Sequence, residues 1–224
     1  MIWQVDVRRT YPPEAGGFAL DVSFRSAAAR VVLFGPSGSG KSQTLKAIAG
    51  LARPDGGRIA IADTVLFDAS RRLDVPARDR RLAYLFQDYA LFPHLTVVQN
   101  VAFGLRGGWL NPGRSPRDES VRRWIDAFGL GPVADLHPHQ LSGGQRQRAA
   151  LARALAPSPR ALLLDEPFAA LDASLRARLR DELDALLRTL DTPMILISHD
   201  EEDVRRFGDD VIRIDGGRVA TGVG

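Results

Sequence analysis

Residues 35–42 constrain the fold of this chain more than any other segment, because Gly35-Pro36-Ser37-Gly38-Ser39-Gly40-Lys41-Ser42 fits the pattern G-x-x-x-x-G-K-[ST]. The apolar run 31–34 before it predicts a buried strand, and the spacing of apolar residues over 45–51 predicts a helix after it. In that context glycines let backbone N–H groups converge on phosphate oxygens, and the helix start adds partial positive charge. The sequence therefore predicts an α/β fold with a phosphate-binding loop.

Two side chains at the end of this loop suit a nucleotide. Lys41 is placed to reach the outer phosphates, and the hydroxyl of Ser42 suits Mg²⁺. Of the 30 Lys and Arg residues, only Lys41 and Lys46 are lysines. A chain that uses arginine almost everywhere keeps a lysine where a compact ammonium fits between phosphate oxygens.

Composition narrows the classes of function. The chain has 224 residues, of which 45% are hydrophobic and 25% charged, so it resembles an ordinary globular protein and we treat 1–224 as a single domain. The absence of cysteine excludes disulfides and thiol catalysis. The net charge of +3 gives little reason to expect a nucleic acid partner. No apolar run approaches the ~18 residues of a membrane helix, so any membrane role would come through a partner.

Short apolar and alternating segments predict strands around the loop. We expect an antiparallel β layer beside the nucleotide strand, and a closing hairpin at the end of the chain. A further apolar strand is expected to end at Gln87, where an α/β sheet presents groups to a ligand. The expected strands cover 2–7, 18–24, 30–34, 58–62, 64–67, 82–86, 161–165, 194–197, 210–214 and 218–220.

Candidate catalytic groups follow two of these strands. Asp165 and Glu166 end the apolar run 161–164, where adjacent charges are costly unless a cation or a reaction uses them. Asp165 suits a Mg²⁺ shell and Glu166 suits a water molecule, because strand alternation points their carboxylates in different directions. His199 follows the strand at 194–197, so we expect it at the same sheet edge.

A second helix start also suits an anion. Ser142 and Gln145 fit the capping-box pattern S-x-x-Q, and the helix is expected to run to Ala156. Gly143 and Gly144 leave the first backbone amides uncovered, as an anion site requires. A well-capped helix without a ligand is the alternative interpretation.

Two other segments have less specific patterns. A leucine stripe over 175–190 predicts an amphipathic core helix with i,i+4 pairs Arg178–Glu182 and Arg180–Asp184. Six aromatic residues fall between Tyr84 and Trp109. They indicate either packing within a helical subdomain or a groove for a partner's helix.

The order of these motifs resembles the nucleotide-binding subunit of ATP-binding cassette (ABC) transporters over nearly the whole chain. The matching segments are the phosphate loop, the glutamine loop at Gln87, the signature L-S-G-G-Q at 141–145, Asp165-Glu166, a Leu-Asp loop at 171–172 and the switch histidine His199. The resemblance implies a P-loop NTPase core, a RecA-like mixed sheet flanked by helices, at 1–86 and 158–224. It also implies an N-terminal antiparallel β subdomain and an inserted α-helical subdomain at 87–157. Many such subunits carry a C-terminal regulatory domain, which we do not expect here because the sequence ends soon after the last predicted hairpin.

The resemblance also implies an ATPase that works as a head-to-tail dimer with ATP and Mg²⁺. Its partners would be transmembrane permease subunits, contacted through the region after Gln87, and indirectly a substrate-binding protein, at the cytoplasmic face of the inner membrane. Catalytic roles would fall to Glu166, His199, Gln87 and Lys41, and Mg²⁺ ligation to Ser42, Gln87 and Asp165. Nucleotide contacts would come from residues 35–42, Gln43, Tyr11, Ser142, Gly143, Gly144, Gln145 and Asp172.

The sequence also indicates a class of importer, and it departs from the usual pattern of the family at a few positions. The segment 86–94 and the short start at 17–24 look like oxyanion importers of the molybdate/tungstate or sulfate type. Gln43 replaces a common second hydroxyl, Ala169 replaces a common serine, and the aromatic residue on adenine is Tyr11 or Phe18. Two alternatives remain, namely a DNA-maintenance ATPase, which needs a coiled-coil insertion that no sustained heptads support, and a regulatory module that only binds ATP.

Overall fold

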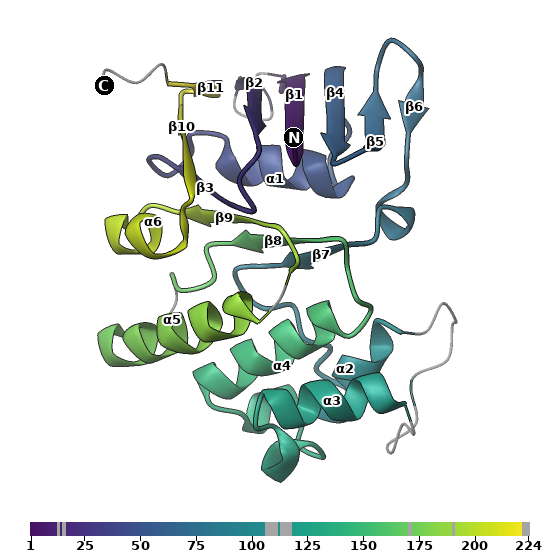
Figure 1. The fold of residues 1–224 in the computed structure, drawn as a ribbon, viewed down its shortest axis with the longest axis vertical. Helices are drawn as coiled ribbons and strands as arrows, with labels where there is room; N and C mark the ends of the chain where they lie inside the picture. Colours follow the sequence, from purple (N-terminus) through teal and green to yellow (C-terminus); the bar gives the residue numbers. More distant parts are fainter. Residues whose placement is uncertain are drawn as a thin grey trace.

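A single curled sheet organises the protein. The computed structural model describes residues 1–12, 14, 17–105, 112, 118–169, 172–189 and 191–220. In this part of the chain the strand order is β6-β5-β4-β1-β2-β11-β10-β3-β9-β8-β7 (Figure 1). The strands are β1 Trp3–Thr10, β2 Ala19–Ser26, β3 Arg30–Phe34, β4 Gly56–Ile61, β5 Thr64–Asp68, β6 Leu73–Asp74, β7 Leu82–Leu85, β8 Ala161–Asp165, β9 Met194–Ser198, β10 Asp210–Asp215 and β11 Arg218–Val219.

The half of the sheet from β10 to β7 is parallel and carries the phosphate loop. β3 pairs in parallel with β9 and β10, and β8 pairs in parallel with β7 and β9. Every residue of β8 and β9 is buried, which explains their continuous apolar sequence, because both faces of a parallel sheet are covered. The carboxyl ends of these strands therefore share one edge, as the sequence predicted for 161–166 and 194–199.

In the other half of the sheet the strands from β6 to β2 pair antiparallel, and β11 joins them by a parallel contact with β2. β1 pairs with β2 on one side and with β4 on the other. Residues of β2 alternate between exposed and buried along its whole length, in agreement with the period-two pattern of its sequence. β1 continues to Thr10, beyond the predicted end at residue 7, because its last residue still pairs with Ala19 of β2.

Helices cover both faces of the parallel strands. They are α1 Lys41–Ala49, α2 Val97–Phe103, α3 Glu119–Ala127, α4 Gly143–Leu155, α5 Ala173–Arg188 and α6 Glu201–Phe207. Figure 1 places α1 on the side of the antiparallel strands, and α2, α3, α4 and α5 on the opposite side of β7, β8 and β9. The described residues form two hydrophobic cores, one on each face of the parallel strands, and successive residues of β3 belong to different ones. Val32 packs in the core with α2–α5, whereas Val31 and Leu33 pack in the core with α1.

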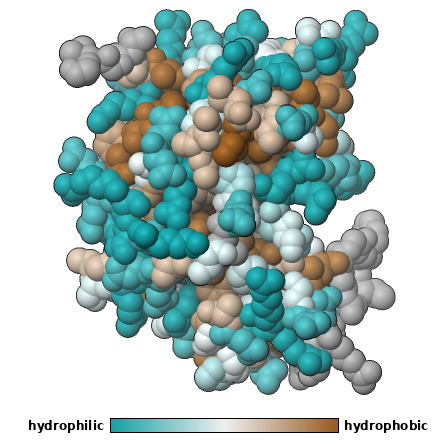
Figure 2. Space-filling view, in the orientation of Figure 1, coloured by the Kyte–Doolittle hydropathy of each residue, from teal (hydrophilic) through white to brown (hydrophobic). Residues whose placement is uncertain are grey.

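The outer surface is mostly polar on the face shown. Figure 2 shows hydrophilic residues over most of the view, with apolar residues gathered around the strands in its upper half. Across the described ranges, none of the helices combines the length and the apolar composition needed to cross a bilayer.

Candidate nucleotide site

The phosphate loop joins β3 to α1 and depends on glycine at two tight positions. A Cβ on Gly35 would overlap the carbonyl oxygen of Ile214, and Gly35 has a positive φ of 155°. Gly40 has a φ of 104°, and a Cβ there would lie 2.8 Å from Cδ1 of Leu20. Both positions exclude a side chain, so the loop keeps its backbone close to the neighbouring strands.

Several polar groups of the loop have no hydrogen-bond partner among the described residues. Gly40 caps α1 without a side-chain hydrogen bond, and within the described residues the amides of Gly38, Gly40 and residues 41–43 have no acceptor. The hydroxyl of Ser39 is buried and makes no hydrogen bond. Unpaired buried polar groups are rare in native structures, and a helix start with free amides binds anions. The loop therefore fits a phosphate chain.

Lys41 folds back over this loop. Its Nζ donates hydrogen bonds of 2.7 Å to the carbonyl oxygens of Gly35 and Pro36. Burial lowers the pKa of Lys41, and the nearby carboxylates of Glu166 and Asp165 act in the opposite direction. The ammonium thus lies at the mouth of the loop, within reach of an anion held by the loop amides.

Asp165 ends β8 and is held by two hydroxyl groups. Ser42 Oγ donates to its Oδ1 at 2.9 Å, and the phenol of Tyr84 donates to its Oδ2 at 2.6 Å. Burial, together with the bond to Asp165, raises the pKa of Tyr84 far above its usual range. The pairing of a hydroxyl and a carboxylate at the loop suits Mg²⁺, which favours oxygen ligands. Sequence reasoning missed Tyr84, although a hydroxyl in the apolar run 82–86 was a visible signal.

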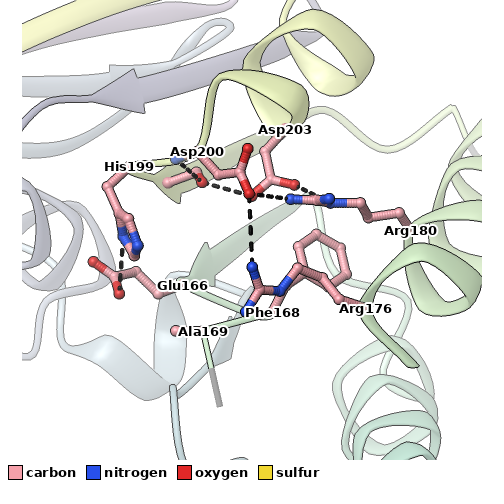
Figure 3. A pocket seen from close by; sticks show the side chains of 9 residues that line it. Glu166, Phe168, Ala169, Arg176, Arg180, His199, Asp200 and Asp203 are labelled. Atoms are coloured by element: carbon pink, nitrogen blue, oxygen red, sulfur yellow. Dashed lines mark hydrogen bonds and ion pairs between the residues drawn. The ribbon is translucent and has the colours of Figure 1, made fainter. Parts of the chain in front are cut away.

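Glu166 directly follows β8, and its carboxylate has a different neighbour from that of Asp165. Its backbone takes a left-handed conformation with a φ of 47°, which is strained for a non-glycine residue and is often found at functional sites. Its Oε2 lies 3.6 Å from Nδ1 of His199. The side chain of Glu166 is 18% exposed and that of His199 is 54% exposed, so both are accessible to water and ligand (Figure 3).

A hollow of about 490 Å³ is lined by Tyr11, Phe18, residues 37–43, Gln87 and Glu166. Asp165 and His199 do not line it, but each contacts a residue that does, Ser42 and Glu166 respectively. Gln87 is exposed at its rim. Tyr11 donates a hydrogen bond of 2.8 Å from its phenol to Oε1 of Gln43 and lies 6.1 Å from the ring of Phe18. The structure therefore brings together the predicted groups at 11, 35–43, 87, 165, 166 and 199.

The second helix start lies apart from this hollow. Ser142 and Gln145 form the predicted capping box, with bonds of 3.3 Å and 2.8 Å. Ser142 is exposed, and the amides of Gly143 and Gly144 have no acceptor among the described residues. None of the signature residues lines the hollow, and neither does Asp172, which caps α5. Within one chain, the signature turn and the phosphate loop are therefore two separate helix starts with free amides.

Comparison with known proteins decides the family. The sequence model described as "ABC transporter" matches residues 20–169. The chain belongs to the ABC transporter family. The fold class and the family predicted from the motifs are thereby confirmed.

Relatives of this ABC chain include importers of two oxyanions. It is 40% identical over 216 residues to the molybdenum import ATP-binding protein ModC of Paramagnetospirillum magneticum, covering 96% of the chain and 57% of that protein. It is 45% identical over 194 residues to the sulfate/thiosulfate import ATP-binding protein CysA of Bradyrhizobium diazoefficiens, covering 84% of the chain and 54% of that protein. The chain thus spans little more than half the length of these relatives.

A solved structure of another cassette matches the ABC chain over its whole length. The dimeric ATP-binding cassette MJ0796, in a post-hydrolysis state bound to ADP and Pi, has a TM-score of 0.75 and 29% identity. The match covers 98% of this chain and 96% of that one. This agreement extends the family assignment beyond residues 20–169.

Two ion pairs predicted on α5 of the ABC chain are wrong. Arg180 does not pair with Asp184, because its guanidinium is buried against acids of α6. Asp184 instead contacts Arg30 and Arg188 at 3.1 Å. The predicted Arg178–Glu182 pair is also missing, and Glu182 lies 3.6 Å from an arginine of α4. Helical spacing places residues on one face, but tertiary neighbours decide which partner is nearest.

The segment after Gln87 is tied to the signature helix. Arg153 of α4 donates hydrogen bonds of 2.8 Å and 2.7 Å to the carbonyl oxygens of Tyr89 and Ala90. The ring of Phe92 packs 4.3 Å from that of Phe103. These contacts account for part of the aromatic cluster as packing, while Trp109 lies outside the described residues.

Proposed function

We propose that this chain is the ATP-hydrolysing subunit of an ABC importer and that two copies pair head to tail around two ATP molecules. The observation that carries the proposal is the convergence of Lys41, Asp165, Glu166 and His199 beside a loop in which several amides have no partner within the described residues. A site that only binds a nucleotide does not need a strained glutamate beside a histidine.

In the proposed reaction each group has a distinct role. Loop amides and Lys41 hold the phosphates and stabilise the charge that develops on the departing phosphate. Ser42, Asp165 and Gln87 would hold Mg²⁺, which supplies positive charge between the phosphates. Glu166 takes a proton from the attacking water, and ATP and water become ADP and phosphate. His199, 3.6 Å from Glu166, would hold the γ-phosphate and keep the water in line.

The pairing of two copies follows from the two separate anion sites. One copy presents its phosphate loop, and the exposed signature turn at Ser142 with the free amides of Gly143 and Gly144 would come from the other. Asp172 would reach across the same contact. ATP then supplies the negative charge that both positively polarised helix starts need. Hydrolysis removes a shared ligand, so the copies part.

Transport would need further subunits. We place this chain at the cytoplasmic face of the inner membrane, where the segment after Gln87 would contact transmembrane permease subunits, with a substrate-binding protein acting indirectly. Two relatives named for import, ModC at 40% identity and CysA at 45%, support an oxyanion such as molybdate/tungstate or sulfate as cargo.

The substitution Glu166→Gln tests the proposal. It keeps the size of the side chain and removes the base, so ATP turnover should fall about 10²–10⁴-fold while ATP binding stays within about threefold. Glu119→Gln, at an exposed position on α3, is the matched control and should turn over ATP at the parent rate. Equal turnover by Glu166→Gln and the parent would remove Glu166 from the reaction.

A further inference from the structure

Arg180 lies at the centre of an ionic network close to His199, in which Arg180 and Asp203 are buried (Figure 3). Its three guanidinium nitrogens donate one hydrogen bond of 2.6 Å each, from Nε to Asp203, from Nη1 to Glu202 and from Nη2 to Asp200. The side chain of Arg180 is 4% exposed. One cation from α5 therefore holds three carboxylates at the start of α6.

The same network fixes the backbone on both sides of His199. Ser198 donates a hydrogen bond of 2.5 Å to Oδ2 of Asp203, and the amide of Asp200 donates one of 3.0 Å to Oγ of Ser198. Asp200 also caps α6 by accepting a bond from the amide of Glu202. The polar contact of the His199 side chain within the described residues is the one with Glu166 at 3.6 Å. The position of His199 thus depends on its two neighbours.

Arg180 also packs against the segment that follows Glu166. Its guanidinium lies 5.8 Å from the centre of the Phe168 ring, which stacks on Phe207 at 5.8 Å. Phe168 is two residues after Glu166. One side chain therefore contacts the segments that carry both the proposed base and the histidine facing it.

Charge explains why the arrangement depends on Arg180. Burial alone would lower its pKa, but the hydrogen bonds to Asp203 and Asp200 raise it, so the guanidinium stays charged. Arg176 lies 3.8 Å from Asp200 and offers a second cation there, but Asp203 is buried and accepts its bond from Nε of Arg180 (Figure 3). Without Arg180, these carboxylates would repel each other and leave a buried charge uncompensated.

We propose that Arg180 is a positioning residue that sets the imidazole of His199 against Glu166, acting through Ser198 and Asp200 without touching the nucleotide. This inference rests on the proposed function, because it gives His199 a part in ATP hydrolysis. Arg180 extends from α5, which begins at Ala173 directly after its cap Asp172, so it also joins the helix that Asp172 caps to the segment that carries His199.

The test compares Arg180→Ala and Arg180→Lys with Arg178→Ala, an exposed neighbour on the same helix. Displacement of a reacting group by about 1 Å can reduce turnover about 100-fold, so Arg180→Ala should lower kcat about 10–100-fold with KM within about threefold. Arg180→Lys keeps a positive charge and one donor nitrogen, so its kcat should lie between those of Arg180→Ala and the parent. Arg178→Ala should match the parent in both constants.

A double-mutant cycle separates positioning from a loss of folding. In a His199→Ala background, Arg180→Ala should change kcat less than about twofold, because the group it positions is already gone. If the kcat of the double variant fell by the product of the two single-variant losses, the inference would be overturned. So would a parent-like kcat in Arg180→Ala that remains folded by thermal melting.

The imidazole resonances give a readout without turnover. The chain has four histidines, so the signals of His199 are assigned by their loss in His199→Ala. Arg180→Lys, which keeps the buried charge and serves if Arg180→Ala does not fold, should shift or broaden the His199 signals and leave the other three unchanged. Unchanged His199 signals would contradict the inference. A parent that hydrolyses no ATP would contradict the proposed function instead, and the resonances would still decide the role of Arg180.

Discussion

Ser42 donates a hydrogen bond of 2.9 Å from its hydroxyl to Oδ1 of Asp165, across 123 positions of the chain. The first residue lies in the first turn of α1 and the second ends β8, so the parallel half of the sheet brings them together. Two oxygens that we propose as ligands of one Mg²⁺ are thus already adjacent. The second carboxylate oxygen of Asp165 accepts a hydrogen bond from the phenol of Tyr84, so Tyr84 helps to fix the same carboxylate.

Tyr84→Phe should weaken Mg²⁺ binding. The change removes the 2.6 Å bond that holds Oδ2 of Asp165 and leaves the ring in place. Loss of a partner that orients a metal ligand typically costs about 10–100-fold in metal affinity or activity. We expect the Mg²⁺ concentration for half-maximal ATP turnover to rise by about that factor, measured by titration at saturating ATP.

Tyr89→Phe is the matched control for Tyr84→Phe. The phenol oxygen of Tyr89 is buried and makes no hydrogen bond, so its removal breaks no contact. The Mg²⁺ requirement should equal that of the parent, and the melting temperature should stay the same or rise. If both variants raised the Mg²⁺ requirement equally, the bond from Tyr84 to Asp165 would not be the cause.

The site could be predicted from the sequence where chemistry and topology act together. Gly35–Ser42 fits a pattern that is specific to phosphate-binding loops. Asp165, Glu166 and His199 follow apolar strands, and the carboxyl ends of neighbouring parallel strands lie at one edge of a sheet. The capping box of Ser142 and Gln145 depends only on residues close in sequence, so the sequence predicts it as well. These features depend on short segments and on the general geometry of parallel sheets.

Other contacts could not be predicted, because they depend on tertiary distances. Nothing in the sequence indicates that Arg180 reaches α6 in preference to Asp184, which is one turn away. The same is true of the Tyr84 bond to Asp165, which requires the register of β7 against β8. Periodicity indicates which face a residue occupies and leaves open which of several charged neighbours it meets.

Tyr11→Ala should weaken nucleotide binding if this ring stacks on adenine. Tyr11 lines the hollow beside the loop and is fixed by its bond to Gln43 and by the guanidinium of Arg9, 4.7 Å from its ring centre. Stacking of a base on an aromatic ring is worth about 1–3 kcal/mol, so we expect about a 5–100-fold higher Kd for a fluorescent ATP analogue. Phe18→Ala tests the second candidate, and a larger loss there would assign adenine to Phe18.

Asp184→Asn should destabilise the fold near neutral pH and have a smaller effect in acid. Burial alone would raise the pKa of Asp184, but hydrogen bonds from Arg188 and Arg30 outweigh it, so its pKa lies below the usual value. The unfolded chain then binds a proton more readily, so this stability is fully present above about pH 4 and is lost as the pH falls through the lower folded-state pKa. We expect a loss of about 1–3 kcal/mol at pH 7.

Denaturant titration at pH 7 and near pH 3 measures this difference. Asp181→Asn is the control, since Asp181 lies on the same helix and its side chain is 69% exposed in its pair with Arg206. Surface pairs contribute little, so its loss should stay below about 1 kcal/mol. A difference between Asp184→Asn and the parent that was as large near pH 3 as at pH 7 would contradict the assignment.

Chemical cross-linking tests most directly the central claim that two copies present different helix starts to one ATP. The chain contains no cysteine, so Ser37→Cys and Ser142→Cys, both at exposed positions, give single-thiol variants of the phosphate loop and the signature. The variants are mixed, with Glu166→Gln in each to prevent turnover, and treated with a short dithiol-reactive cross-linker. We predict a covalent dimer of one Ser37→Cys and one Ser142→Cys chain that forms with ATP and not without it. The account would be contradicted if folded chains that bind ATP gave no mixed dimer. It would also be contradicted if the amount of mixed dimer were the same with and without ATP.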